Sequence, residues 1–181
     1  MKGEARLDET ASGLAPATEG WFVVNVRDVA WFTSEAFGSA CRFEGPEAQF
    51  EELGINIRVL RPGQPACLYH AESLQEDFLV LAGEGLLLVN GEERTLRPWD
   101  FVHCPPGTEH VFVGAGDDPC VILMTGVRSD DEKIVYPASE VAGRHGASAE
   151  KETTSPPEAY APYSRPEPRR PESWGQLPWA Q

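Results

Sequence analysis

A histidine and two glutamates stand close together just before a strongly apolar run of the chain. The segment LYHAESLQEDFLVLAGEG contains His70, Glu72 and Glu76, and a second polar cluster, WDFVHCPPGTEHVFV, contains His103 and His110. Imidazole and carboxylate groups exchange protons and bind divalent metals, so acid–base or metal chemistry is open to these residues. Two interpretations follow. The polar groups lie on a solvated edge where a strand begins, or they converge inside on something that neutralises them.

Short strands separated by turn residues would position these side chains. Apolar and β-branched runs recur about every 8–12 residues, with Gly, Pro, Asn and Asp between them and no helical period. The expected strands are Trp21–Val26, Phe37–Phe43, Ile55–Leu60, Cys67–Glu72, Phe78–Leu81, Trp99–His103, Glu109–Val113 and Cys120–Thr125. Asn90-Gly91 predicts a hairpin, because both central residues of a type I′ turn need positive φ. The pattern predicts an all-β sandwich or barrel.

The two polar clusters together resemble the motifs of the cupin superfamily, which consists of jelly-roll barrels, also described as double-stranded β-helices. His70 stands at the first histidine of the first motif, and Glu76 and Gly83 have the spacing of its glutamate and closing glycine. The Pro-Pro-Gly turn before His110 matches the second motif in register.

Three positions depart from the cupin pattern. Trp99 stands where the second motif opens with glycine, and Gly114 stands where asparagine is usual. Glu72 replaces the second histidine of His-x-His. The resemblance covers about residues 50–127 and leaves the C-terminal part of the chain unexplained.

The resemblance implies one divalent metal ion inside the barrel, held by His70, Glu72, Glu76 and His110. Four such groups facing an interior would be costly without a counter-charge, and the spacing of the nearby arginines aims none of them clearly inward. Two neutral imidazoles and two carboxylates balance the metal charge to about zero, which favours Mn²⁺ or Fe²⁺, whereas the affinity order favours Zn²⁺ or Ni²⁺. The alternative is that the glutamates are solvated and the histidines are ordinary surface or core residues.

Further residues are expected near the metal. Phe78, Phe112 and Met124 would line an apolar pocket, with core packing as the alternative for all three. His103 either lines the pocket as a general base or packs near the Pro-Pro-Gly turn.

Changes in residue composition along the chain predict three parts. Residues 1–20 are small and polar, which indicates a flexible N-terminal arm, and residues 21–127 form the barrel. Residues 128–181 form a proline-rich C-terminal extension, with a short helix between Ser139 and Gly146. Its aromatic residues predict a strap that docks on this barrel or on a partner, and they are Tyr160, Tyr163, Trp174 and Trp179.

Composition limits the partners. Lys and Arg total 15 against 29 Asp and Glu, and the formal charge of −14 repels nucleic acid and anionic membranes. The chain shows neither a membrane-spanning run nor a signal segment, so a cytoplasmic location is expected. The four cysteines are widely spaced and are expected to be buried small hydrophobic residues. Small cupins are often dimers, so the resemblance implies a homodimer, with Trp21–Val26 and the tail as interface elements.

The resemblance does not decide between an enzyme, a binding protein and a barrel with a structural metal. We expect a metal-dependent enzyme acting on a small organic molecule, of dioxygenase, isomerase or lyase type. One alternative is a non-catalytic cupin that binds or senses a small molecule. The other is a barrel with a purely structural metal, because four protein ligands can close a tetrahedral site.

Overall fold

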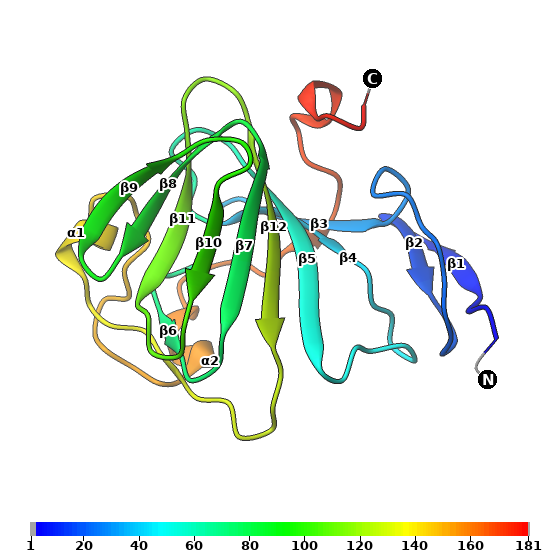
Figure 1. Cartoon of the computed structure of the whole chain (residues 1–181), viewed down its shortest axis with the longest axis horizontal. Coiled ribbons are helices and arrows are strands. Elements are labelled where there is room, and N and C mark those ends of the chain that lie inside the picture. The colour runs from blue at the N-terminus through cyan, green and yellow to red at the C-terminus, as the bar shows by residue number, and fades with distance from the viewer. Residues whose placement is uncertain (1–2, 181) are drawn as a thin grey trace.

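The chain folds almost entirely into short antiparallel strands (Figure 1). The computed structural model describes residues 3–180. The strands are β1 (Leu7–Thr10), β2 (Gly13–Pro16), β3 (Ala30–Ser34), β4 (Gly38–Arg42), β5 (Leu53–Leu60), β6 (Ala71–Glu72), β7 (Glu76–Ala82), β8 (Glu84–Val89), β9 (Glu92–Leu96), β10 (Phe101–Cys104), β11 (His110–Ala115), β12 (Cys120–Val127), β13 (Ile134–Val135) and β14 (Glu167–Pro168). The helical segments are α1 (Glu140–Gly143), α2 (Pro156–Ala159) and the 3-10 turn η1 (Trp174–Gln176).

Two curved sheets surround a shared interior (Figure 1). The larger sheet has the strand order β10-β7-β12-β5-β4-β3-β14, and the smaller one has the order β11-β8-β9. The chain that leads into β6 extends the smaller sheet, because backbone bridges join Pro65 to Val113 and His70 to His110. The prediction of an all-β barrel is confirmed.

Alternate residues of both sheets fill the barrel. The interior cluster consists of Leu60, Ala66, Phe78, Val80, Leu87, Leu96, Cys104, Phe112, Cys120 and Ile122. On β5 the other face is covered as well, because Ile57 and Val59 pack with Trp31 in a second cluster. The polar residues of the same strand, Asn56 and Arg58, therefore point into the barrel, where they line a cavity.

The β8–β9 hairpin has the predicted turn. Val89 pairs with Glu92 across a two-residue loop. Asn90 has φ 47° and Gly91 has φ 80°, so both adopt the left-handed conformation that a type I′ turn requires.

Two expectations for the N-terminal region are wrong. Leu7–Pro16 is a β-hairpin instead of a flexible arm, and it lies at the end of the molecule away from β8 and β9 (Figure 1). Trp21–Val26 is not a strand, because only Trp21 forms a backbone bridge, to Glu4. Val26 packs against the Trp31 cluster while Trp21 stays 57% exposed. The segment is thus held by side-chain packing on one side rather than by a strand ladder.

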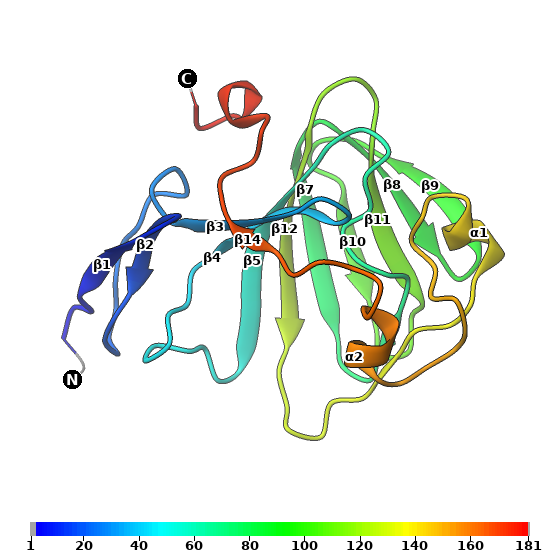
Figure 2. The same ribbon diagram turned by 180° about the vertical axis from the view of Figure 1, so that it is seen from behind.

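The C-terminal extension lies against the barrel. As predicted, Ser139 caps the short helix α1, its hydroxyl accepting a hydrogen bond from the Ala142 amide. Figure 2 shows the chain passing from α2 across this face of the molecule to β14, which pairs with β3, and then to η1. Leu177, near the end, is only 1% exposed. None of the helices within residues 3–180 is long and apolar enough to cross a bilayer.

Candidate metal centre

Three buried or half-buried side chains converge at the barrel opening near β6. His70 comes from the chain just before β6, Glu76 begins β7 and His110 begins β11. One potential ligand atom from each lies within 4.8 Å of the others. His110 Nε2 is 3.3 Å from Glu76 Oε2, and His70 Nε2 is 4.0 Å from the same oxygen. Residues far apart in the sequence thus form one group that could hold a metal ion.

Backbone carbonyls orient both imidazoles. His70 Nδ1 lies 2.7 Å from the Leu68 carbonyl oxygen, and His110 Nδ1 lies 3.0 Å from the Thr108 carbonyl oxygen. A carbonyl oxygen can only accept, so each neutral imidazole carries its proton on Nδ1. Each Nε2 lone pair is therefore directed toward Glu76, as a metal ligand requires.

The electrostatics of this group call for a positive charge. Burial, together with the neighbouring Glu72, raises the pKa of Glu76 to about 7. Burial and the nearby His70 lower the pKa of His110 to about 4, which keeps that imidazole neutral. Burial opposes the charged form of His70, but Cys67 and the two glutamates outweigh it and hold its pKa well above the ordinary value. Without a metal, the site must retain protons; a divalent cation would replace them.

Glu72 lies at the edge of this group. Its Oε1 is 3.5 Å from His70 Nε2, but it is not one of the three mutually close residues. Its carboxyl group is hydrogen-bonded to Glu132, and burial with this bond raises the pKa of Glu132 to about 7. Burial disfavours ionisation of Glu72, yet the bond with His70 lowers its pKa. A carboxyl–carboxylate pair therefore stands beside the three potential ligands.

The group opens into a cavity of about 320 Å³. Phe78, Phe112 and Met124, which were expected to lie near the metal, line it. His103 does not, and its expected place in the pocket is wrong. It alternates outward on β10, with Nδ1 2.6 Å from Asp77 Oδ1 and its side chain 51% exposed, while its neighbour Cys104 points into the core.

Sequence reasoning missed several lining residues. Arg58 comes from β5, Glu132 from the loop after β12, and Tyr136 and Tyr160 from the C-terminal extension. For Glu132, the run SDDE has the composition of a solvated turn, so no sequence signal marked it. Cys67 also lines the cavity and is half-buried, whereas the other three cysteines are buried as predicted.

A family model that matches the barrel strands of this chain identifies its family. Residues 56–126 match the family model described as a cupin domain. The barrel of this chain is a cupin domain. The suggested resemblance is thereby confirmed, and the matched residues include His70, Glu76 and His110. No curated protein matches this sequence.

Solved structures with similar folds include proteins of different activities. A sugar phosphate isomerase of the cupin superfamily from Silicibacter pomeroyi is 23% identical, with a TM-score of 0.54 over 62% of this chain and 79% of that one. The polyketide cyclase RemF from Streptomyces resistomycificus is 17% identical, with a TM-score of 0.51 over 58% and 78%. A putative sugar phosphate isomerase from Acidithiobacillus ferrooxidans is 28% identical, with a TM-score of 0.45. That match covers 46% of this chain and 55% of the Acidithiobacillus protein. The likenesses to the Silicibacter and Streptomyces proteins show the cupin fold alone.

Proposed function

We propose that this cupin binds one divalent metal ion and is a metal-dependent enzyme acting on a small organic molecule in the barrel. His70, Glu76 and His110 would hold the ion, with Glu72 as a fourth ligand. The observation that carries the proposal is that the Nε2 atoms of His70 and His110 both lie within 4.0 Å of Glu76 Oε2, while a backbone carbonyl oxygen holds the Nδ1 of each ring. When bound, the ion would polarise an oxygen of the substrate.

The cavity supports an enzyme over a purely structural metal site. Four protein ligands close a tetrahedral structural site, whereas these residues line an open cavity of about 320 Å³, in which a five- or six-coordinate ion would keep a position for substrate. Glu132 supports proton-transfer chemistry, as in an isomerase or lyase. Its carboxyl group lines the cavity next to Glu72, so it stands where it could give a proton to a substrate or take one from it. A non-catalytic binding protein would need the same cavity but no such group.

Metal analysis of the full chain, grown in metal-defined medium, tests the site. His70→Ala and His110→Ala should each lose the bound metal, because each removes one imidazole from the group. His103→Ala is the matched control, since it removes an imidazole outside the cavity and should keep the metal. Retention of metal in both of the first two variants would discard the site. The metals to be compared are Mn²⁺, Fe²⁺, Zn²⁺ and Ni²⁺.

A second experiment separates catalysis from binding. Metal-loaded protein is screened for turnover of small organic acids and sugar derivatives. In Glu132→Gln any turnover should fall about 10²- to 10⁴-fold, the range for loss of a general acid–base, while metal content stays unchanged. Equal turnover in this variant would remove Glu132 from the mechanism. Binding without turnover in the wild type would favour the non-catalytic alternative.

Location and oligomeric state stay predictions. The expected cytoplasmic homodimer is tested by localisation of the tagged chain and by light scattering on the purified protein.

A further inference from the structure

Arg58 lies inside the barrel without an acidic partner. Its Nη1 donates to the Phe37 carbonyl oxygen at 3.0 Å. Its Nε–H is buried and finds no acceptor among the described residues. Within residues 3–180 no carboxylate lies at ion-pair distance from this guanidinium. Because Arg58 is half-buried and its buried Nε–H is unpaired, the site is suited to an anion supplied by a ligand.

Arg128 provides a contrast within the same cavity. It also lines the cavity, but its Nη1 and Nη2 donate to the two oxygens of Glu44 at 2.6 and 2.8 Å. This bidentate pair neutralises Arg128 and holds it in place. Arg58 is therefore the arginine of this cavity that remains available to an anionic ligand.

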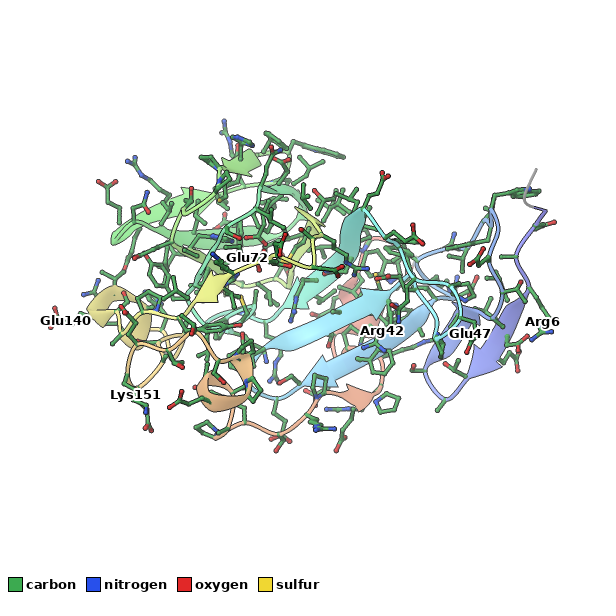
Figure 3. The ribbon with its side chains drawn as sticks, turned by 90° about the horizontal axis from the view of Figure 1, so that it is seen from below. Arg6, Arg42, Glu47, Glu72, Glu140 and Lys151 are labelled. Atoms are coloured by element: carbon green, nitrogen blue, oxygen red, sulfur yellow. The ribbon has the colours of Figure 1, made fainter. Side chains whose placement is uncertain are left out.

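A second cavity adjoins the first at Arg58. It has a volume of about 600 Å³ and shares Arg58, Cys67 and Tyr160 with the metal-site cavity. Among its described lining residues are two further arginines, Arg42 and Arg165, and no Asp or Glu. In a chain of net charge −14, such a lining concentrates positive charge. Figure 3 shows Glu72 over the barrel and Arg42 farther along the larger sheet.

Asn56 adds a second unpaired polar atom. Its Oδ1 is buried and has no donor among the described residues, and the residue lines the metal-site cavity. Asn56 and Arg58 lie on the same face of β5, about 7 Å apart along the strand. One group needs a hydrogen-bond donor and the other needs an anion. A ligand that satisfies both carries a hydrogen-bond donor, such as a hydroxyl group, and an acidic group.

We propose that the substrate is a hydroxylated organic anion whose phosphate or carboxylate group pairs with Arg58, while its hydroxylated end lies between Asn56 and the His70–Glu76–His110 group. The planar guanidinium can bind either acidic group through two hydrogen bonds. This assignment rests on the proposed function, because it treats the anion as part of the molecule that reaches the metal.

Calorimetric titration of the full chain tests the assignment, with and without bound metal. The probes are glycerol 3-phosphate, glycerate and neutral glycerol. The first two should bind to metal-loaded protein more tightly than glycerol, and the tighter of them identifies phosphate or carboxylate as the preferred group. If neither anion binds more tightly than glycerol, the assignment is overturned.

Variants at Arg58 locate the anion. Arg58→Gln should weaken binding of the preferred anion about 10- to 100-fold, the range for loss of charged hydrogen bonds. Arg58→Lys keeps the charge in a chain of similar length and should lose less. Arg97→Gln is the matched control, because Arg97 is 84% exposed and lies on the β9–β10 connection, so its affinity should stay within about twofold of wild type. Unchanged affinity in folded Arg58→Gln, or an equal loss of affinity in Arg58→Gln and Arg97→Gln, would overturn the assignment.

Metal content separates the two proposals. Arg58→Gln that keeps its metal but loses the anion supports the anion assignment. The wild type could instead hold no metal under any loading condition and still bind the anion through Arg58. That result would refute the proposed metal enzyme and still support the Arg58 anion site.

Discussion

Replacing Glu76 by glutamine separates the stability of the metal-free barrel from its ability to bind metal. The carboxyl group is about 15% exposed, and burial with the nearby Glu72 raises its pKa from 4.5 to about 7. The folded protein therefore retains a proton that the unfolded chain releases. The contribution of protonated Glu76 to stability is fully present below about pH 4.5. It is lost as the pH rises through about 7, because ionisation is less favourable in the folded state.

The size of this effect follows from the shift. A difference of about 2.5 pKa units corresponds to about 3 kcal/mol, and residual contact with water reduces it to about 2–3 kcal/mol. Glutamine does not titrate. Metal-free Glu76→Gln should therefore be more stable than wild type by this amount at about pH 8, and by much less at about pH 5. The same variant should bind metal at least about a hundredfold more weakly, since it lacks the carboxylate 3.3 Å from His110 Nε2.

Urea unfolding of chelator-treated protein at the two pH values measures the first effect, and metal titration measures the second. Glu92→Gln is the control, because this exposed glutamate on β9 forms a surface ion pair with Arg94, and its loss should change stability by less than about 1 kcal/mol. A constant difference between wild type and Glu76→Gln across this pH range would refute the argument about burial. Undiminished metal binding in the variant would remove Glu76 from the proposed ligands.

Three further outcomes are expected. Glu72→His changes a charge-balanced site to one with a net charge of about +1 when a divalent metal is bound. A metal-competition assay should therefore show a shift in preference toward Zn²⁺ or Ni²⁺. Unchanged metal preference and affinity would contradict the charge argument. Metal affinity should fall at least about tenfold between about pH 8 and pH 6, with proton release on binding, because both Glu76 and His70 must lose a proton. Calorimetry in buffers of different ionisation enthalpy measures the proton release, and a pH-independent affinity would count against this reasoning. Leu177→Ala should lower the free energy of unfolding by about 2–4 kcal/mol, since Leu177 is 1% exposed and packs in the Trp31 cluster; equal urea midpoints would show that the tail is not docked in solution.

The barrel and its three central residues could be predicted because the signals are local. Strand runs, the Asn90-Gly91 turn and the spacing around His70, Glu76 and His110 each depend on a few neighbouring residues. The turn needs two left-handed residues, and both are present. The resemblance to the cupin motifs implied that these residues meet inside one barrel, and the structure brings His70, Glu76 and His110 together.

Alternation along a strand shows which residues share a face, but it does not show what covers that face. On β5 the alternation of Ile57 and Arg58 has the pattern of a strand with one solvated side. The packing of Trp31 against Ile57 covers the opposite side, and Arg58 consequently points into the barrel. His103 shows the reverse case, since the parity of β10 sends it outward to Asp77.

The sequence by itself determined the β architecture, because strand period and turn chemistry are properties of short segments. The grouping of His70 and Glu76 with His110 was implied by the resemblance to the two cupin motifs. Only the tertiary structure decided that Arg58 and Glu132 join this site. The position of Arg58 depends on which elements cover β5, and the position of Glu132 depends on where the loop after β12 meets the barrel. Both are contacts between distant parts of the chain, which the composition and period of either segment do not specify.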